Sequence, residues 1–271
     1  MLRLGHIHYS NCLPVHAQLL AEPGPDLQIV HGTPGELNLA LARGDIDVAP
    51  CSSIEYARQA PHYRLIPGLV IGSHGHVRSI RLESTIPLSE LGGRSVAVPT
   101  ASATSVVLLR ILLERRYGSR VHFIWFNQEA AHDPIAEGAA AALWIGDQAL
   151  LRAAQPDRTS HDLGELWTDW TGLPFAFALW QVRLGPEHDA ALHSLAQRLH
   201  ASIHTSLTQP LRLAERYADQ FGMTPQQLAD YWYGLRFGLD QPMLRGLSRF
   251  YEMAAELGEV PGVPPFRWLT D

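Results

Sequence analysis

The first half of the chain alternates short apolar runs with segments of helical spacing. Each apolar run has the length of a strand, and each helical segment begins shortly after one ends. Strands are expected at residues 2–7, 27–31 and 46–49, and helices are expected to begin near Asn11, Thr33 and Ser52. Such alternation predicts an α/β fold with a largely parallel sheet.

Two of these helix starts carry a capping signal. Thr33-Pro34-Gly35-Glu36 has threonine at the N-cap, proline at the first helical position and glutamate at the third. The pattern Ser52-Ser53-Ile54-Glu55 predicts a second capping box.

A second set of strands and helices follows between residues 87 and 145. Its strands are expected near Val96, at 122–125 and at 141–145. Extended stretches at 77–84 and 175–183 flank this section and are candidate hinge strands that carry the chain out of a first domain and back. The pattern from 187 to 259 is helical, and the proline-rich tail from 261 to 271 is expected to lie extended over the surface.

The stretch from Pro99 to Ser105 joins a buried strand to an apolar helix. It holds four hydroxyl residues in six positions, namely Thr100, Ser102, Thr104 and Ser105. Free backbone N–H groups and the dipole at a helix N-terminus favour a carboxylate or phosphate there. A single cap would explain one of these hydroxyls but not all four. The stretch is therefore a candidate anion site.

Composition removes several classes of function. The chain has 271 residues and a net charge of −6, and all 21 of its basic residues are arginine. The absence of lysine excludes a lysine Schiff base, a pyridoxal phosphate anchor and a Walker-type phosphate lysine. The negative charge argues against nucleic acid as a partner. No leader pattern and no long apolar run occur, so we expect a cytoplasmic protein with no membrane partner.

Cysteines and histidines give no strong metal motif. Cys12 and Cys51 are best interpreted as reduced thiols. The pairs His6/His8 and His74/His76 could each offer two ligands on one strand face, but solvated or core histidines are the favoured interpretation. No metal and no cofactor are expected.

Ligands of open parallel sheets bind beyond the carboxyl ends of the strands, so the turns at those ends are the places to search. They offer mainly neutral hydrogen-bonding groups and helix N-termini, which suit a small organic acid with one or two carboxylates. Asn11, Ser52 and Asp147 could each be a helix cap instead. The candidate residues are Asn11, Ser52, Ser53, Ser79, Ser102, Thr104, Ser105 and Asp147. The residues alone thus indicate a two-domain, hinge-closing binder of small carboxylates.

The chain also resembles a known family, the chorismate dehydratases of the futalosine route to menaquinone, which share the fold of the type 2 periplasmic solute-binding proteins. The order and spacing of several short motifs carry the resemblance. They are Gly5-x-Ile7-x-Tyr9-x-Asn11-x-x-Pro14, Gly32-x-Pro34-x-x-Leu37-Asn38, Gly44-Asp45-Ile46-Asp47-x-x-Pro50-x-Ser52-Ser53-x-Glu55-Tyr56, Val77-x-Ser79-Ile80, the turn from Ser102 to Ser105, Ile145-Gly146-Asp147-x-Ala149-Leu150, Asp162-Leu163-Gly164-x-x-Trp167 and Thr171-Gly172-Leu173-Pro174-Phe175.

The resemblance implies a two-domain α/β fold with a ligand cleft between the domains. The first domain would comprise 1–83 plus 183–271, with the C-terminal helices packed on it, and the second would comprise 84–182. The implied activity is a cofactor-independent hydro-lyase that converts chorismate to 3-[(1-carboxyvinyl)oxy]benzoate and water.

By the same resemblance, Asn11 and Ser79 would act at the reacting end of the substrate. Carboxylates would be held by Ser52, Ser53, Ser102, Thr104 and Ser105. Asp147 would either orient a hydroxyl or cap its helix, and capping is favoured. No strong base is evident, so a carboxylate of the substrate itself is a candidate for removing the proton.

Two other functions stay open. The sister enzyme releases 1,4-dihydroxy-6-naphthoate from cyclic dehypoxanthine futalosine and relies on a histidine in the middle domain, whereas the corresponding turn here reads Gly146-Asp147. A non-catalytic carboxylate receptor would use the same fold but is expected to carry a signal peptide or lipid anchor. The oligomeric state is not predicted.

Overall fold

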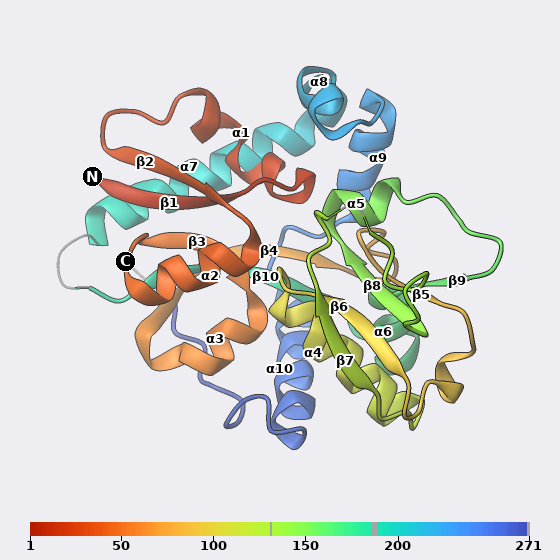
Figure 1. Ribbon diagram of the computed structural model, residues 1–271. Coiled ribbons are helices and arrows are strands. Elements are labelled where there is room, and N and C mark those ends of the chain that lie inside the picture. Colours follow the sequence, from red (N-terminus) through yellow and green to blue (C-terminus); the bar gives the residue numbers. More distant parts are fainter. Residues whose placement is uncertain (131, 186–188, 270–271) are drawn as a thin grey trace.

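The computed structural model describes residues 1–130, 132–185 and 189–269, and the strands in this part of the chain form two five-stranded sheets, one in each lobe (Figure 1). In the first sheet the order is β2-β1-β3-β10-β4. Its strands are β1 (Leu2–Ile7), β2 (Leu27–Gly32), β3 (Val48–Ser52), β4 (Tyr63–Ser73) and β10 (Phe175–Arg183). β1 pairs in parallel with β2 and β3, while β10 is antiparallel to β3 and β4.

The second sheet repeats this arrangement in the order β7-β6-β8-β5-β9. Its strands are β5 (Ile80–Ser84), β6 (Ser95–Pro99), β7 (His122–Phe126), β8 (Ala141–Ile145) and β9 (Thr159–Asp162). β6 is parallel to β7 and β8, and β5 is antiparallel to β8 and β9. Each sheet is therefore mixed, with a parallel set of three strands where the sequence predicted a largely parallel sheet.

The two expected hinge strands each belong to one sheet. β5 pairs within the second sheet and β10 within the first, so the chain crosses between the lobes at residues 74–79 and returns at 172–174. The boundaries expected at 83/84 and 182/183 are corrected accordingly. A strand hydrogen-bonded on both sides cannot belong to the neighbouring lobe, and the short segments before β5 and β10 make the crossings.

Helices cover both sheets. Those of the first lobe are α1 (Leu13–Ala21), α2 (Pro34–Arg43) and α3 (Ser53–Gln59), and those of the second are α4 (Ala103–Ile111), α5 (Gly146–Leu151) and α6 (Leu163–Thr171). The C-terminal helices are α7 (Asp189–Thr208), α8 (Pro210–Tyr217), α9 (Pro225–Gly234) and α10 (Gln241–Glu256). α7 packs against α1, whereas α10 contacts both β10 and α4, so these helices cover the first lobe and also reach the second.

The short helical turns are η1 (Ser10–Cys12), η2 (Ala60–His62), η3 (Leu88–Glu90), the π-helical η4 (Leu112–Arg116) and η5 (Ala218–Phe221). At α2 the predicted capping box is confirmed, because Thr33 accepts from the Glu36 N–H and Glu36 accepts from the Thr33 N–H. The box predicted at Ser52 is wrong, since the Ser52 side chain caps no described backbone group of α3. Asn38 on α2 accepts from the Ser52 N–H at 3.1 Å instead.

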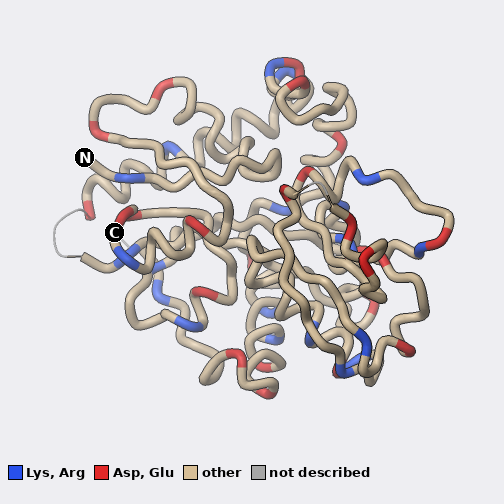
Figure 2. Tube along the Cα trace, viewed as in Figure 1, with Lys and Arg blue, Asp and Glu red and all other residues tan. Residues whose placement is uncertain are grey.

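The tail lies along β4, where Leu65 forms an isolated parallel bridge with Trp268. Acidic and basic positions are interspersed along the trace without a continuous basic stripe (Figure 2). No described helix has both the length and the apolar character needed to cross a membrane.

Candidate functional site

A cavity of about 50 Å³ lies where the two lobes meet. Its walls come from the carboxyl ends of strands, from the first turns of helices and from the segment at 74–79. The lining residues are Ile7, Tyr9, Asn11, Pro34, Pro50, Ser52, Ile71, Ser79, Ile80, Ser102, Ser105, Ile145, Gly146, Phe177 and Ala178. Five of the eight predicted site residues are therefore brought together, although they come from segments far apart in the sequence.

Asn11 lies in η1, directly after β1. Its Oδ1 atom is buried and has no hydrogen-bond partner among the described residues. A buried amide oxygen without a partner costs free energy, so it is suited to accept a hydrogen bond from a bound molecule.

Ser79 ends the crossing between the lobes, just before β5. The side chain is buried, and its Oγ accepts a hydrogen bond from the Tyr231 hydroxyl at 2.8 Å. The Ser79 hydroxyl faces the Val77 carbonyl oxygen only at 3.5 Å, a weak bond. Its proton is thus available to a molecule in the cavity.

Ser52, Ser102 and Ser105 place the N-termini of two helices at the cavity. Ser52 immediately precedes α3 in the first lobe, and Ser102 is the N-cap of α4 in the second lobe. The Ser102 hydroxyl donates to Ser105 Oγ at 2.8 Å and accepts from the Ser105 N–H at 3.4 Å. The positive ends of two helix dipoles therefore face the cavity from opposite lobes, which favours an anion there.

Ser53 and Thr104 do not line the cavity but hold the lobes against one another. The buried Ser53 hydroxyl donates to the Ala176 carbonyl oxygen at 2.8 Å. Across the interface, Thr104 Oγ1 accepts from the Ile54 N–H at 3.2 Å and lies 3.4 Å from Ser53 Oγ. The second-lobe helix α4 thus supplies a hydrogen bond to the first turn of α3.

Asp147 likewise lies outside the cavity lining, and the favoured capping role is wrong. Its carboxylate accepts from the Ser10 N–H at 3.0 Å and from the Ser10 hydroxyl, while the cap residue of α5 is Ile145. The alternative interpretation, that it orients a hydroxyl in the site, stays a prediction; the hydroxyl bonded to it in the structure is that of Ser10. Burial raises the pKa of Asp147, the bonds from Ser10 oppose that rise, and Glu129 adds to it. The pair joins η1 of the first lobe to α5 of the second.

Gly146 allows the two lobes to approach closely at the same place. Its φ is +63°, and a Cβ atom there would lie 2.9 Å from atoms of the Tyr9 ring. The Tyr9 hydroxyl accepts from Gln128 Nε2 at 3.2 Å, and Gln128 also bonds both backbone groups of Ile145. Tyr9 therefore closes one side of the cavity against the second lobe, a role that the sequence pattern around Tyr9 did not predict.

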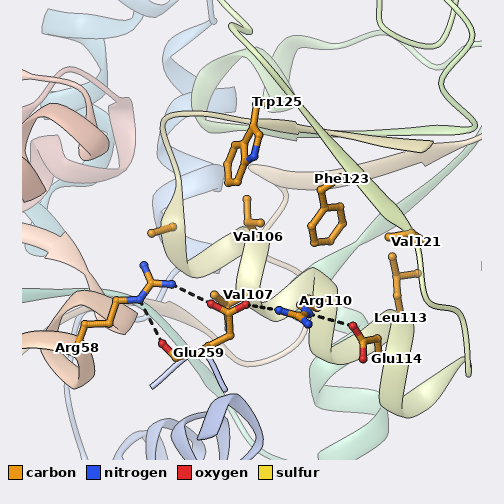
Figure 3. A pocket seen from close by; sticks show the side chains of 11 residues that line it. Arg58, Val106, Val107, Arg110, Leu113, Glu114, Val121, Phe123, Trp125 and Glu259 are labelled. Carbon is orange, nitrogen blue, oxygen red and sulfur yellow. Dashed lines mark hydrogen bonds and ion pairs between the residues drawn. The ribbon is translucent and has the colours of Figure 1, made fainter. Parts of the chain in front are cut away.

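The cavity lining, taken over the described residues, contains no charged side chain. A hollow of about 370 Å³ outside α4 does contain arginines, but Arg58 and Arg110 are both paired with Glu259, at 3.0 and 2.7 Å (Figure 3). Arg110 is also paired with Glu114 at 2.9 Å. These cations are already neutralised, so the uncharged cavity between the helix N-termini is the better site for a carboxylate.

A buried cluster behind η1 brings together His6, Cys12 and His16. The Trp180 indole N–H donates to His16 Nε2 at 2.9 Å, so the proton of His16 is on Nδ1, which faces His6 Nδ1 at 3.0 Å. Burial raises the pKa of the Cys12 thiol to about 12 and lowers that of both imidazoles, chiefly by desolvation. The geometry fits a pair of neutral, hydrogen-bonded imidazoles better than a metal site, because a metal ion would need both Nδ1 lone pairs. For His6 and His8 the sequence favours solvated or core histidines; the structure buries His6 and places its Nδ1 atom 3.0 Å from His16 Nδ1.

Sequence comparison identifies the family. Residues 2–256 match the model of a family described as menaquinone biosynthesis. The chain belongs to this menaquinone-biosynthesis family. The chorismate dehydratase of Thermus thermophilus is 30% identical over 266 residues, 92% of this chain and 93% of that protein. The chorismate dehydratase of Campylobacter jejuni is 30% identical over 179 residues, 64% of each chain.

Solved structures similar to this member of the menaquinone-biosynthesis family confirm the fold. The protein AF1704 from Archaeoglobus fulgidus superposes with a TM-score of 0.79 at 18% identity, over 96% of this chain and 98% of that one. The periplasmic aliphatic sulphonate binding protein SsuA from Escherichia coli has a TM-score of 0.66 at 17% identity, over 97% and 94%. The predicted periplasmic-binding-protein-like fold is therefore confirmed.

Proposed function

We propose that this protein is a chorismate dehydratase, which converts chorismate to 3-[(1-carboxyvinyl)oxy]benzoate and water in menaquinone biosynthesis. The main support is the chorismate dehydratase relative that aligns over 92% of the chain. The cavity agrees with this assignment because it combines two helix N-termini with the side chains of Asn11 and Ser79. The proposal includes a cytoplasmic location, which the family's role in menaquinone biosynthesis supports.

The two carboxylates of chorismate would be bound by charge-assisted hydrogen bonds. The helix N-termini at Ser52 and Ser102 supply backbone N–H groups and hydroxyls from both lobes. A dicarboxylate bound to both lobes stabilises their closed arrangement. At about 50 Å³ the cavity is far below the roughly 300 Å³ or more that a small ligand needs, so the lobes open to admit the substrate.

The reaction removes a ring hydroxyl and the proton of the adjacent ring carbon. The C–H electron pair becomes part of the aromatic ring, the C–O bond breaks, and the hydroxide leaves as water with the proton removed from the ring carbon. No electrons are exchanged with a second reactant, so the proposed chemistry is redox-neutral and needs no redox cofactor.

In this mechanism Ser79 donates its proton in a hydrogen bond to the departing hydroxyl oxygen. Asn11 Oδ1 accepts from the same hydroxyl group and keeps it oriented. The bond from Ser79 strengthens as negative charge develops on the oxygen, whereas the bond accepted by Asn11 orients the hydroxyl group before the C–O bond breaks. No carboxylate or imidazole of the described residues lines the cavity, so a carboxylate of the substrate takes the ring proton. The rim residues Ser10 and Asp147 close the site against water.

The test is to incubate the purified, metal-stripped protein with chorismate and to follow loss of one water by chromatography and mass spectrometry. The wild type is expected to form the enolpyruvyl benzoate, and Asn11→Ala and Ser79→Ala are each expected to lower kcat by about 100-fold or more. Ser119→Ala is the control, because the hydroxyl of this buried serine donates to the Leu88 carbonyl oxygen at 2.9 Å, away from the cavity.

Two outcomes contradict the proposal. Tight chorismate binding in calorimetry without product indicates a carboxylate receptor. If neither binding nor product is observed, the assay is repeated with cyclic dehypoxanthine futalosine, the substrate of the sister enzyme.

A further inference from the structure

Helix α9 contacts both segments that carry the proposed catalytic residues, namely η1 with Asn11 and the crossing at 74–79 with Ser79. It begins at a capping box in which Thr224 and Gln227 bond each other's backbone N–H groups. Trp232 donates its indole N–H to the Ser10 carbonyl oxygen at 2.8 Å, and the preceding Tyr231 donates its hydroxyl to Ser79 Oγ at 2.8 Å. Consecutive residues of one helix therefore fix η1 and the crossing between the lobes.

The hydrogen bond between Tyr231 and Ser79 has one direction in the structure. The single phenolic proton goes to Ser79 Oγ, which accepts it at 2.8 Å. Asn11 lies in η1, the turn whose Ser10 carbonyl oxygen accepts from Trp232, and its Oδ1 atom has no partner among the described residues. Burial raises the pKa of Tyr231 further above its ordinary value, so this proton stays in place.

These hydrogen bonds leave two groups of the protein free to bind a molecule in the cavity. One is the proton of Ser79, whose oxygen already accepts from Tyr231. The other is Asn11 Oδ1, which has no partner among the described residues and lies in the turn that Trp232 bonds. Hydrogen bonds in series polarise one another, so a serine that accepts from a phenol is a stronger donor.

We propose that Tyr231 is a positioning residue for the dehydration, because it fixes the direction in which Ser79 presents its proton to the substrate. This inference rests on the proposed function of Ser79. Tyr231 itself touches no reacting atom, since it does not line the cavity.

The kinetic test is Tyr231→Phe, which removes only the hydroxyl. We expect kcat to fall by about 10- to 100-fold, while KM stays within about threefold, because the carboxylate contacts are unchanged. In the double variant with Ser79→Ala, the loss should be no greater than in Ser79→Ala alone, since both changes remove one interaction. Tyr56→Phe is the matched control, because this buried hydroxyl bonds the Pro265 carbonyl oxygen outside the site.

Three kinetic results overturn the inference. They are an unchanged kcat in Tyr231→Phe, a loss that multiplies fully with that of Ser79→Ala, or a loss matched by Tyr56→Phe at equal thermal stability. The incubation of the wild type with chorismate tests the proposed function without any variant. If the wild type forms product and one of these three results is found, only the inference on Tyr231 fails.

A spectroscopic readout tests the geometry even where the enzyme is inactive or Tyr231→Phe does not fold. A buried phenol that donates to Ser79 should give a slowly exchanging hydroxyl proton signal in the NMR spectrum. We expect this signal to shift in Ser79→Ala and to stay unchanged in Ser119→Ala. A signal that does not respond to Ser79→Ala contradicts the proposed hydrogen bond.

Discussion

Acidification should weaken the first lobe through the buried histidines behind η1. Desolvation, with smaller contributions from His31 and His8, lowers the pKa of His6 from 6.5 to about 3. His16 is wholly buried, and its pKa is also well below the ordinary value. A proton added to His6 Nδ1 would point at the Nδ1–H of His16 across 3.0 Å, so the two donors would face one another.

The sign and size of the effect follow from linkage. A histidine whose folded-state pKa is lowered stabilises the fold above its unfolded-state pKa, and this stability is lost as the pH falls below 6.5. For His6 alone, the free energy of unfolding should fall by about 2 kcal/mol between pH 8 and pH 5, and by about 5 kcal/mol once the pH is below 3. His16 adds a loss of the same sign.

The assay is urea unfolding followed by tryptophan fluorescence at pH 8, 6.5 and 5. His6→Gln keeps a hydrogen-bond acceptor for His16 but cannot gain a proton, so its loss between pH 8 and pH 5 should be smaller than that of the wild type by about 2 kcal/mol. His122→Gln, on the exposed side of the edge strand β7, is the control and should follow the wild type. Equal pH dependence in His6→Gln and the wild type would refute the reasoning.

Three further predictions concern the lobe interface and a helix cap. In Asp147→Asn, loss of the charge-assisted bond to Ser10 should raise the KM for chorismate by about threefold or more with kcat little changed. Steady-state kinetics measure both constants, and a collapse of kcat with binding intact would instead make Asp147 the base. Gly146→Ala places a Cβ 2.9 Å from the Tyr9 ring and should lower kcat/KM by about 10-fold or more. Gly118→Ala is its control, since it has a similar φ of +67° and open space around it, and equal activity of the two variants would exclude the contact with Tyr9 as the cause. Thr33→Ala removes half of a capping box and should cost about 1 kcal/mol in urea unfolding without changing kcat, and an unchanged stability would show that the box contributes nothing.

The local elements were largely predictable because their signals are local. The alternation of apolar runs with helical spacing gave the α/β class, and Thr33 with Glu36 gave the start of α2. The turns after strands pointed to Asn11, Ser52 and Ser102, because residues at the carboxyl ends of parallel strands meet at one edge. The resemblance to chorismate dehydratases added Ser79 and Asn11 as the reacting pair.

The sequence could not distinguish residues that line the cavity from residues that hold the lobes together. Ser53, Thr104 and Asp147 have the same polar chemistry as Ser52, Ser102 and Ser105, but each side chain is used in a contact within or between the lobes. The two groups differ only in the direction of their side chains after the lobes have closed.

The sequence by itself determined where strands, helices and polar turns occur, since these depend on spacings of two to four residues. Only the tertiary structure decided that β10 inserts between β3 and β4, and that Tyr231 reaches Ser79 across 152 positions of sequence. In the sequence Tyr231 is one more aromatic residue on a helix, indistinguishable from core. Its role comes from the packing of α9 against the site, and such packing depends on the fit of surfaces distant in the chain, which no local pattern encodes.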